Sequence, residues 1–171
     1  EAFTRLGSGR RGPVSIEMPM DTMGQQAEVA LLERARMRPP PEVDADRIAE
    51  AAKLLSKAER PMIVIGGGVV DAPAELLELA MLLQAPAVAF RSGRGVIPDT
   101  HYLSHVLPGG YELWKTADVV LGIGSRMEQQ LLHWGTTPGM KVIRIDIDAQ
   151  ELDRIRTPDV AIHADARAAI V

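Results

Sequence analysis

The chain has 171 residues, of which 46% are hydrophobic and 25% charged, and its net charge at pH 7 is −4. These values are those of a globular protein with a sizeable core, and the mild negative charge excludes the basic footprint of a nucleic-acid-binding protein. The lack of cysteine excludes disulfides, thiolate metal sites and a cysteine nucleophile. No apolar run reaches the roughly 18 residues of a membrane span, so we expect no membrane partner.

Residues 1–41 differ from the rest of the chain. Residues 14–18 alternate in polarity and predict one short strand, ended by Pro19, and residues 21–37 hold patches compatible with a helix. Residues 38–41, Arg-Pro-Pro-Pro, predict a stiff linker. Because a lone strand has no sheet of its own, we interpret residues 1–41 as the tail of a preceding domain with its linker, and residues 42–171 as a second domain. The missing start methionine leads us to expect a segment of a longer protein.

The second domain opens with a predicted amphipathic helix at residues 44–57, for which Asp44 is the expected N-cap. Its apolar side chains recur at helical spacing, at Ile48, Ala51, Ala52 and Leu55.

A strand then runs into three consecutive glycines. Residues 61–65, Pro-Met-Ile-Val-Ile, predict a strand buried on both faces, followed by Gly66, Gly67 and Gly68. Asp71 is a possible N-cap and Pro73 a first-turn residue of a helix over residues 74–84. A strand, a glycine turn and a helix N-terminus together favour an anion site, and hence a ligand that carries a nucleotide or phosphate.

The remaining chain alternates strands with helices. Strands are predicted at residues 87–90, 118–124, 141–148 and 160–163, and short helices at 111–116, at 150–155 and after an Asp165 cap. This order predicts an α/β fold with a doubly wound, mostly parallel sheet of about six strands. The glycine turn and residues 91–95, 124–126 and 146–148 all follow strands, so we expect them to meet at one edge of the sheet.

Standard nucleotide motifs fit only in part. The turn supplies the first two glycines of the dinucleotide fingerprint, but Asp71 replaces the third, and the second strand ends in Phe90 and Arg91 without a ribose-binding carboxylate. An ordinary NAD site and a P-loop are therefore disfavoured. The alternative for the triple glycine is a tight turn that allows close helix–sheet packing.

Several side chains have both a functional and a purely structural interpretation. Arg126 can clamp a phosphate or a ribose, or form a surface salt bridge with Glu128. Asp146 and Asp148 are two residues apart on the predicted strand and so share one face, where they can bind ribose hydroxyls or an adenine edge. The histidines are interpreted without chemistry: His101 and His105 as loop residues, and His133, beside Trp134, as a packing residue.

In sequence order, the motifs resemble the central domain of thiamine-diphosphate-dependent enzymes of the acetolactate synthase and benzoylformate decarboxylase group. The tail resembles the last strand of the preceding pyrimidine-binding domain. The similar segments are residues 12–21, 60–68, 92–101, 117–126, 145–148 and 165–166. The resemblance implies a Rossmann-like fold of the DHS-like NAD/FAD-binding type.

The resemblance also implies where the chemistry lies. In such enzymes the catalytic glutamate belongs to the pyrimidine-binding domain, and the Gly-Asp-Gly motif for diphosphate and Mg²⁺ belongs to a later domain. We therefore expect no catalytic or metal-binding residue here, no thiamine diphosphate bound by this chain, and no activity of the chain alone. The parent is expected to be a cytoplasmic homo-oligomer, a 2-keto-acid decarboxylase or carboligase, that is, a lyase or transferase braced by this domain.

Some family members bind FAD or ADP in the central domain, while others leave that site vacant. By position, the family's contacts fall on Gly66, Gly67, Gly68, Phe90, Arg91, Gly124, Ser125, Arg126, Asp146, Ile147, Asp165 and Ala166. Residues 106–110 are shorter than the Met- and His-containing segment of flavin-binding members, and residues 127–130 lack their Phe-Asp-Asp run. Both departures weaken the case for FAD and leave ADP, another nucleotide or no ligand open.

Two other functions remain open from the sequence. One is a stand-alone nucleotide-binding or regulatory module, and the other is a spacer in which the glycines only turn the chain. The substrate of the parent enzyme is not indicated by any of these residues.

Overall fold

The computed structural model describes residues 1–171, which form two compact units, Glu1–Pro40 and Pro41–Val171. The first unit contains two short helices, α1 (Ala2–Gly7) and α2 (Met20–Met23), and none of its residues is buried. The strand predicted at residues 14–18 is absent, because a strand needs a hydrogen-bonded neighbour and this unit offers none. Helix α1 was not predicted, and of residues 21–37 only the start is helical.

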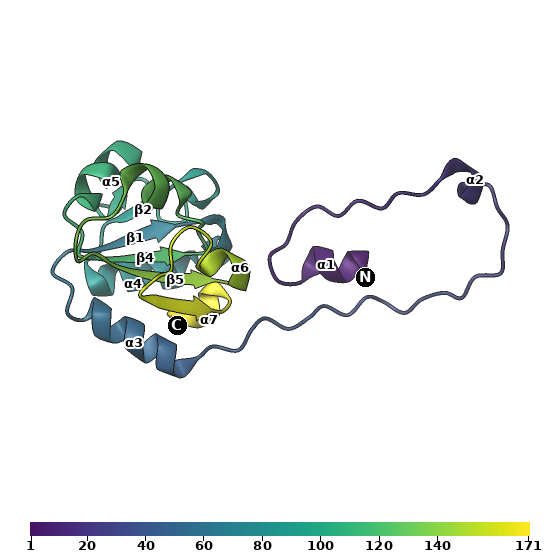
Figure 1. Ribbon diagram of the computed structural model, residues 1–171, viewed down its shortest axis with the longest axis horizontal. Helices are drawn as coiled ribbons and strands as arrows, with labels where there is room; N and C mark the ends of the chain where they lie inside the picture. Colours follow the sequence, from purple (N-terminus) through teal and green to yellow (C-terminus); the bar gives the residue numbers. More distant parts are fainter. The chain divides into compact units, whose positions relative to one another are not determined.

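The second unit is built on a six-stranded parallel sheet with the order β3-β2-β1-β4-β5-β6, which confirms the predicted fold class (Figure 1). The strands are β1 (Pro61–Ile65), β2 (Ala87–Ala89), β3 (Ser104–His105), β4 (Val119–Ile123), β5 (Lys141–Asp146) and β6 (Val160–His163). Strand β3 was missed, because two residues are too few to show a periodicity. The chain reverses its direction of travel across the sheet between β1 and β4, which is where open α/β sheets place ligands.

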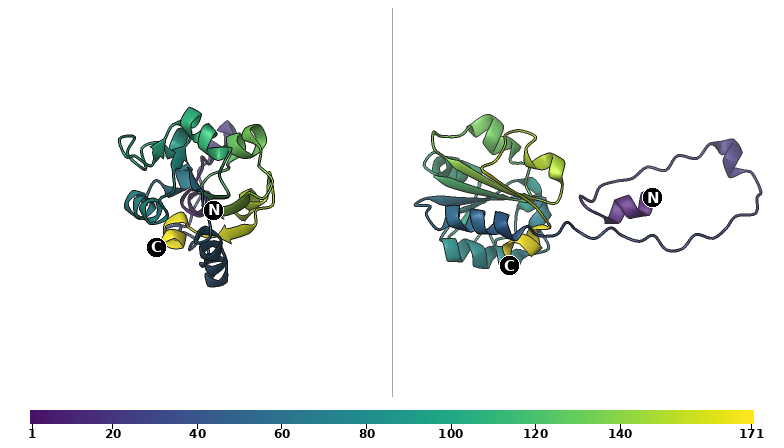
Figure 2. Two further views of the ribbon diagram at one scale, coloured as in Figure 1. Left: turned by 90° about the vertical axis from the view of Figure 1, so that its left-hand side faces the viewer. Right: turned by 60° about the horizontal axis from the view of Figure 1, so that its bottom comes forward.

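Helices cover both faces of this sheet (Figures 1 and 2). Helices α3 (Ala45–Leu55), α4 (Pro73–Leu83) and α7 (Ala166–Ile170) pack on one face, and α5 (Leu107–Trp114) and the π-helix η3 (Gln129–Trp134) on the other. The short elements are the 3₁₀ turns η1 (Gly67–Val69) and η2 (Arg91–Gly93), and helix α6 (Ala149–Leu152).

Strand β1 shows why a continuous apolar run was needed. Ile63 and Ile65 point into the core under α3, α4 and α7, whereas Met62 and Val64 point into the core under α5 and η3. All four are buried. A strand between two helical layers has no solvent face, so it cannot alternate with polar residues.

Two of the three predicted helix caps are confirmed. The side chain of Asp44 accepts from the backbone N–H of Arg47 at 3.2 Å, and that of Asp165 accepts from Ala168 N–H at 3.2 Å. The prediction that Asp71 caps α4 is wrong, because the turn η1 delays the helix until Pro73 and leaves Ala72 at the N-cap. None of the helices is both long and apolar enough to cross a membrane.

Asp118 joins the approach to β1 to the start of β4. Its two carboxylate oxygens accept from the backbone N–H groups of Glu59 at 2.7 Å and Arg60 at 3.0 Å. Burial raises the pKa of Asp118, but these backbone hydrogen bonds outweigh burial and hold the pKa below its ordinary value. The ionised carboxylate therefore stabilises the folded state.

We expect Asp118→Ala to lower the free energy of unfolding by about 1–2 kcal/mol at pH 7, because two backbone donors lose their acceptor. A carboxylate with a lowered pKa stabilises the fold above its unfolded pKa, and this stabilisation is lost as the pH falls below about 4. Urea unfolding at pH 7 and pH 3 measures both effects. The gap between wild type and variant must narrow at pH 3. An equal gap at both values would show that ionisation of Asp118 contributes nothing.

Candidate functional site

The loops that follow β1, β4, β5 and β6 are joined to one another at one edge of the sheet. The N–H of Gly66 donates to the carbonyl of Ile123 at 3.0 Å, and that of Gly124 donates to Ile145 at 2.9 Å. The N–H of Ala164 completes the series by donating to Asp146 at 3.1 Å. This edge, which we call the rim, therefore brings together residues that are about 100 positions apart in sequence.

At the centre of the rim, the glycine turn packs directly on the end of β4. A Cβ atom at Gly66 would overlap the carbonyl group of Gly124, and one at Gly124 would lie 2.5 Å from the Cα of Gly68. Gly124 also has a φ of +54°, which favours glycine. Close contact between two backbones thus explains these glycines without any ligand.

The contact between the glycine turn and the end of β4 also uses backbone N–H groups that a ligand would otherwise bind. The N–H of Gly66 donates to Ile123 and the N–H of Gly68 donates to Gly124 at 3.1 Å. Helix α4 begins only at Pro73, which has no N–H. The glycine turn therefore does not offer the row of free donors that a Rossmann turn offers to a pyrophosphate.

The loop after β2 lies beside the glycine turn. A Cβ atom at Gly67 would come within 2.7 Å of the hydroxyl oxygen of Ser92. The preceding Arg91 has a φ of +50°, and its exposed guanidinium lies 4.8 Å from the centre of the Phe90 ring. The left-handed region is unfavourable for arginine, so the fold imposes this conformation at the rim.

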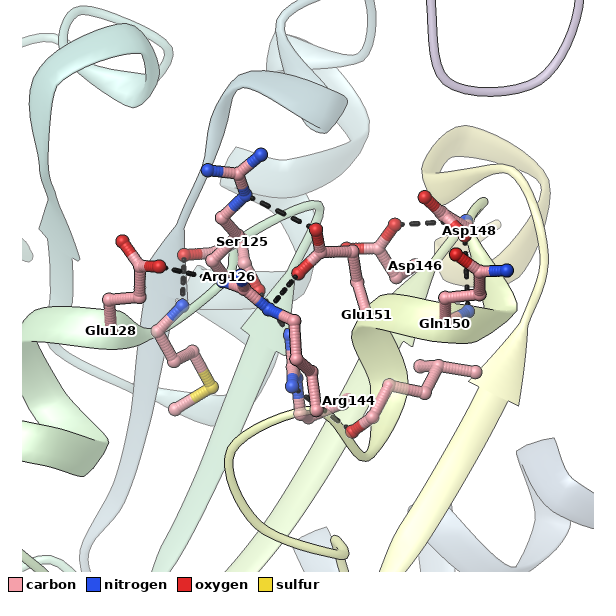
Figure 3. A network of polar contacts seen from close by, with 11 residues as sticks. Ser125, Arg126, Glu128, Arg144, Asp146, Asp148, Gln150 and Glu151 are labelled. Atoms are coloured by element: carbon pink, nitrogen blue, oxygen red, sulfur yellow. Dashed lines mark hydrogen bonds and ion pairs between the residues drawn. The ribbon is translucent and has the colours of Figure 1, made fainter.

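Arg126 projects from the loop after β4 and pairs with a residue that the sequence did not suggest (Figure 3). Its Nε lies 3.3 Å from Oε1 of Glu151 in α6, so Arg126 forms a salt bridge, as one of its two interpretations expected, but with Glu151 in place of Glu128. The next residue, Met127, has a φ of +53° and turns the chain into η3. Because of this turn, Arg126 and Glu128 do not share a face, as residues two apart on a strand would.

Arg154 links the two acidic side chains of this network. Its Nη2 donates to Oε1 of Glu128 at 2.6 Å, and its Nε lies 2.9 Å from Oε2 of Glu151. The hydrogen bond to Glu128 raises the pKa of Arg154. Four side chains, two cationic and two anionic, thus form one continuous chain of contacts at the rim.

Asp146 and Asp148 do not share a strand face, which corrects the sequence prediction. Strand β5 ends at Asp146, whose Oδ1 accepts from the backbone N–H of Asp148 at 3.0 Å. Asp148 instead caps α6 by accepting from Gln150 N–H at 3.1 Å (Figure 3). Between them, the carbonyl of Ile147 lies 3.1 Å from Nε2 of His163.

A buried arginine, which the sequence analysis missed, supports the rim from below. Arg144 on β5 is 1% exposed and donates from Nη1 to the carbonyl of Leu152 at 3.0 Å and from Nη2 to that of Ser125 at 2.9 Å. Burial lowers the pKa of Arg144, while the charges of Asp146 and Glu151 oppose that shift. The sequence feature that could have indicated a role for Arg144 is its position as a cationic residue among the apolar residues of a predicted strand.

The last two predicted residues lie after β6. Ala166 is buried at the start of α7, a helix that contacts η1, and Asp165 caps it. The neighbouring Arg167 pairs with Glu75 of α4 at 2.6 Å, which ties the two helices together.

The histidines do not assemble a site. The Nδ1 of His101 accepts from the backbone N–H of Leu103 at 3.3 Å. No group of three or more histidine, aspartate or glutamate side chains is placed to hold a metal ion. His133 was expected to be a packing residue, but its side chain is exposed, whereas Trp134 packs on Trp114 with ring centres 5.7 Å apart.

Comparisons with known proteins agree on one family. The sequence-family model described as the thiamine pyrophosphate enzyme central domain matches residues 48–171. The acetolactate synthase isozyme 1 large subunit of Escherichia coli K12 is 35% identical over 179 residues, covering 96% of this chain and 31% of that protein. Glyoxylate carboligase of Escherichia coli O157:H7 is 36% identical over 186 residues, covering 99% and 31%. The chain therefore spans about a third of the length of these relatives.

Proposed function

The chain belongs to the family of thiamine pyrophosphate enzyme central domains, and from this premise we propose that its parent is a decarboxylase or carboligase of 2-keto acids. The family match over residues 48–171 is the observation that carries the proposal. The similarity to an acetolactate synthase and to a glyoxylate carboligase supports a parent that joins carbon units. In this role the domain braces its neighbours and contributes no catalytic residue.

In the proposed parent, thiamine diphosphate and Mg²⁺ are held by a pyrimidine-binding and a diphosphate-binding domain. Bound there, thiamine diphosphate supplies the stabilised carbanion that the reaction needs. The parent is proposed to be a cytoplasmic homo-oligomer. The contribution of this chain is a rigid sheet that spaces the two cofactor domains.

Residues 1–41 are proposed to be the end of the pyrimidine-binding domain and its linker. The unit formed by residues 1–40 buries none of its residues, although it holds large apolar side chains such as Ile16, Val29, Leu31 and Leu32. Apolar surface of this extent is stabilised only when another surface covers it. A sheet of the preceding domain would supply that surface and the missing partner for residues 14–18.

The rim is proposed to bind FAD or ADP. Arg126 is 47% exposed and can reach a pyrophosphate, with Arg91 across the glycine turn as a second cation. Asp146 can accept from a ribose hydroxyl, and the exposed Gly68 brings backbone to the surface at the turn. The left-handed conformations of Arg91 and Met127 support a functional role for this edge, because such strain concentrates at binding sites.

The rest of the predicted set acts less directly. Phe90 supports the Arg91 guanidinium, while Gly66, Gly124 and Ser125 shape the floor of the site. Ile147, Asp165 and Ala166 line its far side by position after β5 and β6. This arrangement suits a ligand lying across the glycines, since the backbone contact between Gly66 and Gly124 leaves no space between them.

A thermal-shift panel on the 171-residue chain tests the binding proposal. FAD or ADP at a hundred times its dissociation constant is expected to stabilise the fold by about 2.7 kcal/mol, whereas thiamine diphosphate with Mg²⁺ produces no shift. Arg126→Ala should weaken nucleotide binding about tenfold, because one charge-assisted hydrogen bond is lost. Arg47→Ala, which changes an exposed arginine of α3 paired with Glu50, is the matched control.

The outcomes separate the alternatives. No shift with any nucleotide would remove the binding role and leave the bracing role. A retained flavin that undergoes a reversible redox change would instead favour a stand-alone flavin module. A shift with thiamine diphosphate would contradict the assignment of its site to other domains.

A further inference from the structure

The guanidinium of Arg126 is already engaged by an anion of the protein itself. Its Nε lies 3.3 Å from Oε1 of Glu151 (Figure 3). The two partners differ in exposure: the Arg126 side chain is 47% exposed, whereas that of Glu151 is only 9% exposed. A carboxylate with so little contact with water needs a cationic partner.

Glu151 is the fixed member of this pair. It lies in α6, whose first turn is capped by Asp148, and the backbone N–H of Glu151 donates to the carbonyl of Asp148 at 3.0 Å. The following carbonyl, that of Leu152, is held by the buried Arg144 at 3.0 Å. Arg126, in contrast, is an exposed side chain on a loop, so a ligand can move it more easily than Glu151.

A second cation, Arg154, allows Arg126 to separate from Glu151. Arg154 contacts the other oxygen of Glu151 at 2.9 Å and is itself anchored by Glu128 at 2.6 Å. If Arg126 turns toward a ligand, Glu151 keeps Arg154 and is not left as an unpaired buried charge. The arrangement therefore allows exchange of the Arg126 partner without breaking the rest of the network.

We propose that Glu151 is a resident counter-ion of Arg126, which a ligand phosphate must displace or share. This inference rests on the proposed role of Arg126 in binding phosphate. The carboxylate weakens the attraction of Arg126 for every anion, so it lowers affinity for phosphorylated ligands and leaves affinity for uncharged ones unchanged. Glu151 thus sets how much of the binding comes from the ligand's charge.

The test titrates the full 171-residue chain with inorganic pyrophosphate, ADP and adenosine, following the Nε–H resonance of Arg126 by NMR. Glu151→Gln removes the charge and keeps the shape. It should tighten pyrophosphate and ADP binding about threefold to fivefold, the range expected for a partly exposed ion pair. Adenosine binding should not change. Glu128→Gln is the matched control, because it removes one charge from the same network without touching Arg126.

A second variant keeps the test decisive if Glu151→Gln folds poorly. Arg154→Gln changes an exposed side chain and removes the second arginine that contacts Glu151, while the contact between Arg126 and Glu151 is kept. The Nε proton of Arg126 should then exchange more slowly with water than in the wild type. Unchanged exchange would overturn the proposal.

The outcomes also distinguish this inference from the nucleotide proposal. If ADP and FAD fail to bind but Glu151→Gln still tightens pyrophosphate at Arg126, the nucleotide proposal fails and the counter-ion role holds. If nucleotides bind and Glu151→Gln equals Glu128→Gln or weakens binding, the counter-ion role fails. If pyrophosphate leaves the Arg126 resonance unmoved in both wild type and Glu151→Gln, the counter-ion role fails as well.

Discussion

Replacing Gly66 by alanine is expected to destabilise the sheet domain by about 3 kcal/mol or more. The added methyl group would overlap the carbonyl group of Gly124, and both partners are backbone, so neither can rotate away. Gly66 has a φ of −110°, which alanine adopts freely, so the expected loss is steric and not conformational. Urea unfolding followed by the fluorescence of Trp114 and Trp134 measures it.

Gly67→Ala is the matched control for this substitution. Its methyl group would meet the hydroxyl of Ser92 at 2.7 Å, and that side chain can change rotamer. We expect a loss below about 1 kcal/mol for this variant. Equal losses for the two variants would show that the contact between the glycine turn and β4 is not what requires Gly66.

Arg144→Ala is expected to lower the free energy of unfolding by about 4 kcal/mol. The change empties a site that is 1% exposed and leaves the carbonyls of Leu152 and Ser125 without their donors. Loss of a large buried side chain destabilises by about 2–5 kcal/mol, and each unsatisfied buried acceptor adds about 1–3 kcal/mol, some of which water entering the cavity recovers. Denaturant unfolding at pH 7 gives the value.

Arg144→Met separates the two causes. Methionine refills most of the volume but cannot donate to either carbonyl, so we expect it to recover about half of the loss. A methionine variant as stable as the wild type would show that the desolvation of the buried guanidinium cancels its hydrogen bonds, as happens for some buried ions. In that case Arg144 would be retained for the geometry of the rim and not for stability.

The fold was predictable because its signals are local. The run at residues 61–65, the helix at Ala45–Leu55 and the Asp165 cap are each visible in a window of a few residues. Their periodicity follows from which faces are buried, and that pattern is repeated along the whole chain. The elements of the sheet domain that were missed are short: β3 with two residues, the turns η1 and η2 with three each, and the π-helix η3 with six.

The site was less predictable because its contacts are not local. Glu151, which engages Arg126, lies 25 positions further along the chain, and no spacing rule connects them. Asp146 and Asp148 were assigned to one strand, whereas the strand ends at Asp146. Where a strand stops depends on its neighbours in the sheet, which are distant in sequence.

The parallel α/β architecture, the alternation of strands and helices, and the family of the chain all follow from the amino-acid sequence. These properties can be inferred from burial patterns and short motifs, which are formed by residues close together in the sequence. Three contacts are visible only in the folded chain. The glycine turn packs on the backbone of Gly124, Arg144 donates hydrogen bonds to the carbonyls of Ser125 and Leu152, and Glu151 forms an ion pair with Arg126. Each of these is a contact between loops whose meeting depends on strand order, and strand order is a property of the folded sheet.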